Sequence, residues 1–421
     1  MARKPTFPVL LGISVFQLGI NAVRVIFNSI LLPLQIERIV PAAQKSQVLG
    51  IIVGISVGVG ILVNFFAGIV SDRNLSRLGK RSPFILIGAL FTIPFLLFSL
   101  FFQASIFVIF ISYLGIQLFT NLSLGAYQPL LPDIVPEQNW DREASMQVLM
   151  ALIGSAMAFL AARWISSPEN INVILILLAI VLALSTFFTL WAIKPFDLPV
   201  MRVPEKPLTQ VIHETPRPNR PSNGFFSLVF AIFLIYMGML SLQYFGIYYF
   251  EGVLHLSNPV RAMSIVGPIN LLINMIATLL AIRISKIFGR RNLIIIVITL
   301  AALINLGFPF ARSLGGYMLI ALPYTAMVGL FSPVSMALTS ELVPKEAAGK
   351  FLAYSYLAFG LPNLLSPLIG GFVLSAAGNA PGVNSFIALY ILSSLFYFAG
   401  AISMVKVPRS SHIVTPVSPA P

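Results

Sequence analysis

Residues 68–85 read GIVSDRNLSRLGKRSPFI and form a short charged interruption between two long apolar runs, residues 47–70 and 83–103. Each run holds about the 20 residues that an α-helix needs to cross the hydrocarbon core of a bilayer. The few polar residues between the runs suffice only for a tight connection. The stretch therefore predicts two antiparallel transmembrane helices joined on one side of a membrane.

The composition of the whole chain agrees with this prediction. Of its 421 residues, 58% are hydrophobic and only 9% are charged, and the mean hydropathy is +0.94. A chain this apolar cannot pack as a water-soluble globule, so a bilayer must act as its solvent. The apolar stretch that begins at Pro8 is too long for a cleavable signal segment, and we expect it to remain as the first helix.

The residue content argues against metal and thiol chemistry. The chain has no cysteine, which excludes disulfides, thiolate metal sites and cysteine nucleophiles. Its three histidines, His213, His255 and His412, lack the paired spacing of metal ligands. A membrane-embedded enzyme would need acids, bases or metal ligands near mid-span, and the sequence offers no such group. We expect no metal, no cofactor and no enzymatic activity.

Twelve apolar spans can be marked along the chain. They cover residues 8–36, 47–70, 83–103, 106–129, 144–166, 171–193, 224–252, 258–284, 292–311, 314–339, 351–377 and 383–405. With the N-terminus in the cytoplasm, 20 of the 26 Lys and Arg residues lie on the inside, as the positive-inside rule requires. The net charge of +13 thus reflects topology rather than nucleic-acid binding. We predict an all-α, multi-pass protein of the cell inner membrane with both termini cytoplasmic.

The longest polar stretch, residues 194–223, divides the spans into two sets of six. It contains seven prolines, which resist helix formation, so we interpret it as an extended cytoplasmic linker. The predicted units are a six-helix bundle over residues 1–193, a second bundle over residues 224–406 and a cytoplasmic tail over residues 407–421.

The two sets of spans share short sequence patterns, as expected of a carrier built from repeats. After the fourth span the chain reads LPDIVPE, and after the tenth it reads TSELVPK. After the second span it reads GKR, and after the eighth it reads GRR. The two pairs are offset by 208 and 210 residues, which is nearly the same register. The sequence therefore indicates two pseudo-symmetric halves.

The loop at residues 68–85 resembles the signature loop of the Major Facilitator Superfamily. Its spacer is similar to that of the sucrose carriers and the glycoside-pentoside-hexuronide cation symporters, and the run GAYQPLLPD at residues 125–133 resembles the end of the fourth helix in bacterial members of that group. The resemblance implies two six-helix bundles around a central substrate path and transport by alternating access.

The same resemblance implies an inner gate built from charged residues at the cytoplasmic helix ends. Asp72 is expected to face a helix N-terminus or cations of the other bundle, and Arg73, Lys80 and Arg81 are candidate partners. A second cluster is expected at the turns after the fourth and tenth spans, with a solvated turn as the alternative. The gating candidates are Gly68, Asp72, Arg73, Gly79, Lys80, Arg81, Asp133, Glu137, Arg142, Arg290, Arg291 and Glu341.

The substrate site is expected at mid-membrane, on helices 1, 4, 7 and 10, as the resemblance implies. Helix 1 carries polar side chains at spacings of four, three and four residues, so they share one helical face. Membrane carboxamides need partners in either a wet cavity or a polar helix interface, and they also suit sugar hydroxyls. The substrate-binding candidates are Gln17, Asn21, Arg24, Asn28, Gln117, Asn121, Tyr236, Gln243, Asn270, Asn274, Tyr324 and Asn363.

Arg24 is the most informative candidate, because a guanidinium deep in a membrane is rare and marks a functional site by default. No Asp, Glu or His falls in the middle of a predicted span, since Glu37, Glu169 and Glu251 lie near outer ends. Coupled members of the resembled families carry membrane-embedded charges, so coupling to a proton or a sodium ion is left open. Alternatively, Arg24 binds a carboxylate or phosphate on the substrate.

Tyrosines gather near the outer end of the seventh span, at Tyr244, Tyr248 and Tyr249. Amphipathic rings at such a position are typical of the boundary between membrane and water. We therefore predict an interfacial aromatic belt here rather than a substrate site.

Taken together, these patterns predict a secondary active or facilitative transporter that moves a small polar solute by alternating access. A sugar or glycoside is the first expectation, and organic anions or drugs are the alternative substrates. A further alternative is a non-transporting pigment-delivery or assembly protein on the same fold. The expected partners are a small-molecule substrate and the lipid bilayer, with no nucleic acid, and we expect a monomer.

Overall fold

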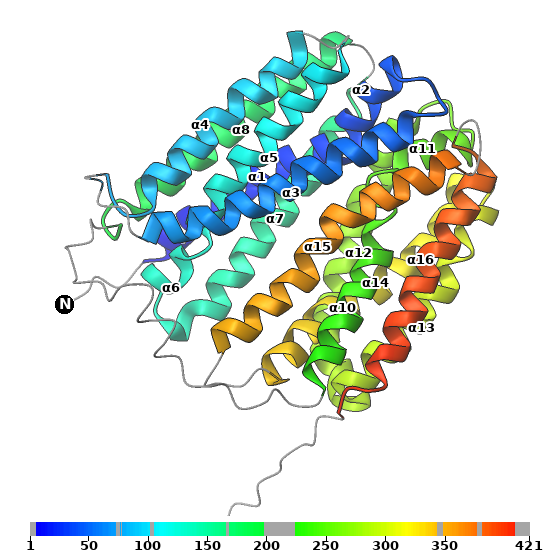
Figure 1. The fold of residues 1–421 in the computed structure, drawn as a ribbon. Helices are drawn as coiled ribbons and strands as arrows, with labels where there is room; N and C mark the ends of the chain where they lie inside the picture. Colours follow the sequence, from blue (N-terminus) through cyan, green and yellow to red (C-terminus); the bar gives the residue numbers. More distant parts are fainter. Residues whose placement is uncertain are drawn as a thin grey trace, which may run out of the picture.

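The computed structural model describes residues 6–72, 76, 78–101, 105–165, 168–197, 224–342, 348–376 and 381–408. Helices make up nearly all of these residues, and no strand occurs among them (Figure 1). The helices of the first half are α1 (Phe7–Ile26), η1 (Phe27–Leu31), α2 (Leu32–Ile39), α3 (Lys45–Asp72), α4 (Ser82–Phe101), α5 (Ile106–Tyr127), α6 (Leu130–Ile134), η2 (Glu137–Asn139), α7 (Trp140–Ala162) and α8 (Pro168–Ile193). Those of the second half are α10 (Phe225–Leu240), α11 (Gly246–Gly252), α12 (Pro259–Phe288), α13 (Arg290–Asn305), η3 (Phe308–Phe310), α14 (Leu314–Leu342), α15 (Ala348–Ala376) and α16 (Val383–Met404).

Eleven of the twelve predicted spans are found as single helical segments, and the seventh is found as two helices. Within the described part of the chain, 11 segments are long and apolar enough to cross a membrane, and α10 is a shorter apolar helix of 16 residues. Helix 1 consists of α1, η1 and α2, and helix 7 of α10 and α11. Figure 1 shows two groups of helices, one from blue to cyan-green and one from green to red. The predicted all-α architecture of two six-helix bundles is therefore confirmed.

Helix 1 changes its winding after Ile26. A π-helical turn, η1, separates α1 from α2. Pro33 near the start of α2 has no backbone N–H to donate to Ser29, and this missing bond favours the wider turn. The π turn contains Asn28, one of the predicted substrate-binding residues, and such turns are frequent at functional sites.

The seventh span differs from its prediction, because residues 224–252 do not form one continuous helix. α10 ends at Leu240 and α11 begins at Gly246. The residues between them form tight turns, in which the N–H of Gln243 donates to the carbonyl of Leu240. Membrane proteins tolerate an interrupted helix where the freed backbone groups are buried in protein or line a cavity. The sequence conceals this break, because the residues on both sides of it are apolar.

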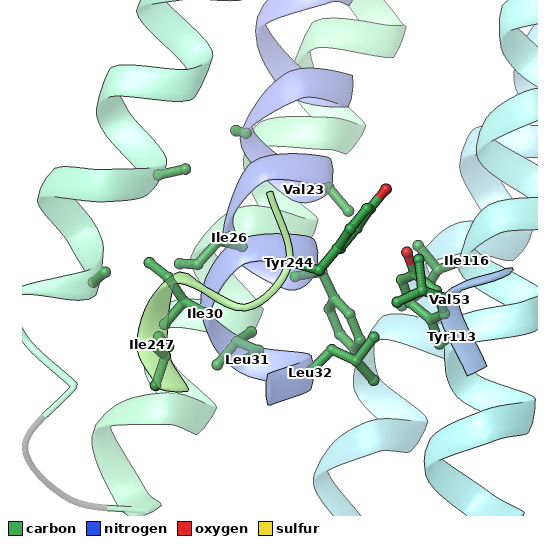
Figure 2. Packing of buried hydrophobic residues seen from close by; sticks show 14 of the residues in the cluster. Val23, Ile26, Ile30, Leu31, Leu32, Val53, Tyr113, Ile116, Tyr244 and Ile247 are labelled. Carbon is green, nitrogen blue, oxygen red and sulfur yellow. The ribbon is translucent and has the colours of Figure 1, made fainter. Parts of the chain in front are cut away.

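The predicted tyrosine belt is wrong. The exposed fractions of Tyr244, Tyr248 and Tyr249 are only 4%, 0% and 2%. The Tyr248 hydroxyl donates to the carbonyl of Pro33 in the other half at 3.0 Å, and Figure 2 shows the ring of Tyr244 beside Val23 of α1. The break in helix 7 turns these side chains inward, whereas a straight helix at the membrane boundary would expose them.

The two halves meet along two helix pairs, α3 with α15 and α7 with α12. In Figure 1, α3 and α15 run side by side near α2 and α11 and diverge toward their other ends. A Cβ atom at Gly50 would lie 2.3 Å from the carbonyl oxygen of Pro367, so the two backbones touch near the start of α3. At Gly58 the nearest atom belongs to the flexible side chain of Leu364. The halves are therefore packed most closely at the predicted outer side.

Candidate functional site

A cavity of about 380 Å³ lies in the second half, beside the break in helix 7. Residues of α10, α11, α12, η3, α14 and α16 line it. The aromatic part of its wall consists of Phe245, Tyr249, Phe308, Tyr317, Tyr324, Phe386 and Tyr390. Three predicted substrate-binding residues, Gln243, Asn270 and Tyr324, also line this cavity. The structure thus brings together candidates from helices 7, 8 and 10.

Polar atoms in the cavity wall offer hydrogen bonds to a bound molecule. Oδ1 of Asn270 is buried and has no hydrogen-bond partner among the described residues. Gln243 is an exposed residue in the helix break. The Tyr324 hydroxyl shares a 2.6 Å hydrogen bond with that of Tyr397. Because an unsatisfied buried acceptor is costly, the Asn270 oxygen marks a place where a ligand or water donates a hydrogen bond.

The other predicted residues of the second half lie outside the cavity wall. Tyr236 packs against the rings of Phe331 and Phe359, with centroid distances of 5.8 and 5.1 Å. Asn363 donates to the carbonyl of Phe359 on its own helix at 2.7 Å. Asn274 belongs to a helix contact, because a Cβ atom on Gly329 of α14 would lie 2.7 Å from its carbonyl oxygen.

The polar face of helix 1 forms hydrogen bonds within itself and with α5. Nδ2 of Asn21 lies 3.0 Å from Oε1 of Gln17. The Tyr113 hydroxyl donates to Oδ1 of Asn28 at 2.9 Å and accepts from Nε2 of Gln117 at 2.7 Å. Tyr113 therefore links two predicted residues, Asn28 and Gln117, and was missed by sequence reasoning. Its position four residues before Gln117, on the same helical face, is the signal that identifies it.

Asn121 takes part in a contact between helices. Its Nδ2 donates to the carbonyl of Gln117 at 2.8 Å. The same nitrogen lies 2.6 Å from where a Cβ atom on Gly60 would be, so α3 passes directly over it. This is the interhelical alternative for a membrane carboxamide.

Arg24 has no counter-ion among the described residues. Its Nε is buried without a hydrogen bond, although the residue as a whole is partly exposed. The charge of Arg24 acts on the phenol groups of Tyr113 and Tyr244. Since Tyr113 belongs to the first half and Tyr244 to the second, the guanidinium lies at the junction of the halves. A membrane cation without a carboxylate partner is left to be neutralised by another species.

The charged loop after α3 forms the predicted cluster, but within one half. The guanidinium of Arg81 is 2% exposed and lies 2.5 Å from Asp72 and 3.0 Å from Asp133. Nζ of Lys80 lies 3.0 Å from Asp72 and 3.4 Å from Asp133. The expectation that Asp72 reaches the other bundle is not met among the described contacts, because the cations of its own half neutralise it.

Asp197, four residues after the end of α8, holds this loop in place. Its carboxylate accepts hydrogen bonds from the backbone N–H groups of Lys80, Arg81 and Ser82 at 2.9, 2.9 and 2.7 Å. Ser82 is the first residue of α4, and Lys80 and Arg81 come immediately before it. Asp197 therefore caps the start of that helix from a distant part of the chain. Gly79 has a φ of +110°, and a Cβ atom on it would lie 2.4 Å from the Asp197 carboxylate. Sequence reasoning assigned Asp197 to the linker and missed this cap.

The second half has a simpler counterpart of this cluster. Nη1 of Arg290 lies 2.8 Å from Glu341. Arg291 does not join it, because its guanidinium donates to the backbone carbonyls of Met404 and Val405 at the end of α16. Gly289 has a positive φ of +77°, like Gly79 in the equivalent turn of the first half. The repeat recognised in the sequence thus extends to the backbone conformation.

The remaining gating candidates either make other contacts or lie outside the described residues. The guanidinium of Arg142 lies over the ring of Phe7 at 5.4 Å, whereas Asp133 of the same expected cluster pairs with Arg81. Gly68 supports the cluster through its carbonyl, which lies 3.4 Å from Nη1 of Arg81. Arg73, residues 343–347 and the side chain of Glu137 lie outside the described part of the structure.

An ion triad around the buried Lys45 joins the two halves on the predicted outer side. Nζ of Lys45 lies 2.6 Å from Glu37 and 2.7 Å from Glu251, and the Lys45 side chain is 7% exposed. Glu37 and Lys45 belong to the first half, and Glu251 belongs to the second. Nζ also lies 4.6 Å from the centre of the Tyr248 ring, within range of a cation–π interaction. Separating a buried cation from such partners is costly, so the triad stabilises the contact between the halves on the predicted outer side.

Glu143 is a buried acid that the sequence analysis missed, because it placed the start of the fifth span too late. α7 begins at Trp140 rather than at residue 144, so Glu143 lies inside this helix and is 0% exposed. The Ser14 hydroxyl donates to its Oε1 at 2.8 Å, and Nε2 of Gln147 lies 3.4 Å from the same oxygen. Oε2 is buried without a partner among the described residues. The predicted spans had left Glu143 in a loop.

Comparisons with known proteins agree with this architecture. The profile of the Major Facilitator Superfamily matches residues 9–329. No match was found among curated proteins. A D-xylose–proton symporter is similar in structure, with a TM-score of 0.73, 18% identity and coverage of 96% of this chain and 98% of that one. A bacterial homologue of the human lysosomal transporter Spinster, inward-facing and unoccupied, has a TM-score of 0.69, 16% identity and coverage of 94% and 97%. A nucleoside transporter has a TM-score of 0.68, 16% identity and coverage of 94% and 99%. At such identities the structural likeness establishes the fold alone.

Proposed function

We propose that this chain, which belongs to the Major Facilitator Superfamily, carries a small polar solute across the cell inner membrane by alternating access. The observation that carries the proposal is the cavity beside the broken seventh helix. A solute-sized space next to a discontinuous helix is the usual form of a substrate site in secondary carriers. Transport is either secondary active or facilitative.

A sugar or glycoside is the first substrate class. The cavity volume of about 380 Å³ is within the range of small-molecule pockets. Its tyrosine and phenylalanine rings present flat apolar faces, on which the C–H face of a sugar ring stacks. Gln243 and the free oxygen of Asn270 supply hydrogen bonds of the kind that sugar hydroxyls form. The likeness of residues 68–85 to the sucrose and glycoside carriers supports the same class.

The contacts between the halves support alternating access. The Lys45–Glu251 pair and the touching backbones at Gly50 hold the predicted outer side shut. α3 and α15 diverge toward the predicted inner side (Figure 1). An arrangement closed outside and divergent inside corresponds to the inward-facing state of a rocking carrier.

An anionic solute is the second candidate, and Arg24 favours it. This guanidinium has no carboxylate partner among the described residues, and its Nε lacks a hydrogen bond. A planar guanidinium binds a carboxylate or phosphate through two parallel hydrogen bonds.

The first experiment is a thermal-shift screen of the purified protein in detergent. Neutral disaccharides, sugar acids, organic anions and hydrophobic cations are each added in excess, since a ligand at about 100 times its Kd stabilises the folded state by roughly 2.7 kcal/mol. Gln243→Ala tests the cavity, with Gln138→Ala on the exposed η2 turn as its matched control. Arg24→Gln tests the charge, with the exposed Arg163→Gln as its control.

The proposal expects stabilisation by a polar solute that Gln243→Ala abolishes and Gln138→Ala preserves. A neutral disaccharide that also stabilises Arg24→Gln supports the sugar class, whereas stabilisation by anions alone, lost in Arg24→Gln, supports the anion class. Stabilisation by pigments or hydrophobic cations, with no response to any polar solute, contradicts the proposal.

A further inference from the structure

Glu143 is a buried acid for which the proposed solute path has no use. It lies in the first turn of α7 and is 0% exposed. One carboxylate oxygen accepts a hydrogen bond from Ser14 of α1 at 2.8 Å, and Nε2 of Gln147 is 3.4 Å away. The other oxygen, Oε2, is buried with no partner among the described residues. One short hydrogen bond does not offset the free-energy cost of burying an ionised carboxyl group.

No described cation neutralises Glu143. From its own helix, Arg142 lies over the ring of Phe7, and the side chain of Asp141 is not described. From α1 it meets Ser14, and from α5 it meets Tyr127, whose hydroxyl donates to the carbonyl of Ile13. The charged groups of the other neighbouring elements are Asp133 of α6, which pairs with Arg81, Glu137 of η2, whose side chain is not described, and Arg283 and Lys286 of α12, which are exposed.

This environment favours the neutral acid. An ionised carboxylate in an apolar surrounding needs a cation or several hydrogen-bond donors. Among the described residues Glu143 has no cation and two donors, both of which bind the same oxygen. A proton removes the charge and gives the acid a hydrogen-bond donor of its own. The proton is therefore the ligand that the site fits, since neither a metal ion nor an anion matches a lone buried carboxyl.

Glu143 is also well placed to report on the movement of the halves. Its partner Ser14 precedes Gln17 by three residues, so Glu143 touches the inner end of the helix 1 face that carries Gln17 and Arg24. Its helix, α7, contacts α12 across the junction of the halves. Arg283 and Lys286 lie near the predicted inner end of α12. We therefore expect closure of the inner side to bring these two cations toward Glu143.

We infer that Glu143 is a proton-binding site that couples protonation to the conformational cycle, an inference that rests on the proposed carrier function. One proton from water joins the carboxylate and the acid forms, and the same proton leaves when the site opens. No electron moves and no other reactant is consumed. The protonated form favours the state described here, closed on the outer side, and the ionised form favours the opposite state.

The test measures the inner opening as a function of pH. The chain has no cysteine of its own, so thiol-reactive spin labels attach only at the two introduced positions, Leu78→Cys and Ile287→Cys. Both positions are exposed, at 69% and 77%, and lie at the predicted inner ends of the two halves. Electron–electron distance measurements then give the ratio of open to closed protein from mildly acidic to mildly alkaline pH. A proton affinity that differs between the states by about one pKa unit changes this ratio roughly tenfold.

Glu143→Gln, a permanently neutral side chain, is expected to keep the acidic distance distribution at every pH, whereas Glu143→Asp retains the pH response. Ser14→Ala removes the donor to the ionised carboxyl, so the midpoint of the distance change moves toward alkaline pH, and this variant serves if Glu143→Gln fails to fold. Infrared spectra of the wild type should contain a protonated-carboxyl band that Glu143→Gln loses.

A full pH response in Glu143→Gln, or a wild-type distance that does not depend on pH, overturns the inference. Glu251→Gln separates this failure from failure of the proposed function, because it perturbs the outer contact at constant pH. If Glu251→Gln changes the inner distance and pH does not, alternating access stands and the proton site is refuted. If neither changes it, the carrier mechanism itself is refuted.

Discussion

The outer ion triad yields a prediction whose size can be worked out from the structure. Glu251→Gln removes the negative charge that the second half presents to Lys45 at 2.7 Å. Two unit charges 4 Å apart attract by about 4 kcal/mol at the effective dielectric constant of a protein surface. The Glu251 side chain is 46% exposed, so solvent screening reduces the net contribution to about 1 kcal/mol. The outer side should therefore open about fivefold more often in Glu251→Gln, since about 1.4 kcal/mol corresponds to a factor of ten.

The assay uses spin labels at Ala42→Cys and Ser257→Cys, two exposed positions on the outer loops of the two halves. The population with a long distance between the labels should rise in Glu251→Gln. Glu37→Gln is the matched control, because Glu37 lies in the same half as Lys45 and within hydrogen-bond reach of Glu251. Glu37→Gln leaves the Lys45–Glu251 pair intact and keeps a hydrogen-bond donor toward Glu251, so the outer side stays closed. An unchanged distance in Glu251→Gln, or equal opening in both variants, refutes the reasoning.

Three further predictions concern the packing of the backbone and one cap. Gly79→Ala should lower the melting temperature more than Gly289→Ala. Both substitutions strain a backbone with positive φ by about 1–3 kcal/mol, but only the first also places a Cβ atom against Asp197. Equal shifts in differential scanning fluorimetry would contradict this. Asp197→Ala should cost about 1–2 kcal/mol by uncapping α4, measured by the same method, and an unchanged melting temperature would show that the cap is dispensable. Gly50→Ala should increase the outer label distance more than Gly58→Ala, because the first collides with the backbone and the second only with a movable side chain; the reverse order would count against the packing argument.

The helices were predictable because hydropathy and length determine them. Residues 47–70 and 383–405 became α3 and α16 with shifts of a few residues, since a bilayer selects for long apolar runs whatever their detailed sequence. The break in helix 7 was not predictable in this way. Hydropathy is an average over many residues, and the break falls among apolar residues such as Leu240 and Phe245 that keep this average high.

The site was predictable where its members lie on one helical face and not where they come together from distant parts of the chain. The face shared by Gln17 and Asn21 follows from spacing alone, and the two are hydrogen-bonded. Lys45 and Glu251 are separated by 206 residues, and no local sequence pattern predicts that they pair. Glu143 was lost for a different reason, because a boundary shift of four residues moved it from a solvated loop into a buried helix turn.

The packing between α3 and α15 is graded along its length, and this gradient determines where resistance to opening resides. At Gly50 and Gly371 the backbones of the two helices are in contact. A Cβ atom added at these glycines would lie 2.3 and 2.4 Å from the carbonyl oxygens of Pro367 and Ser46 on the opposing helix. Farther in, at Gly360, the nearest atoms lie 3.9 Å away on the side chain of Ile61. Dispersion forces decay steeply with separation, so a small rotation of one helix away from the other removes most of the attraction at the glycines. In the wider part of the pair, a side chain can change its rotamer and keep the contact. The resistance to separating α3 from α15 is therefore concentrated near their predicted outer ends. Most of the free energy needed for opening is spent in the first small displacement of these ends, and the wider part of the pair resists little.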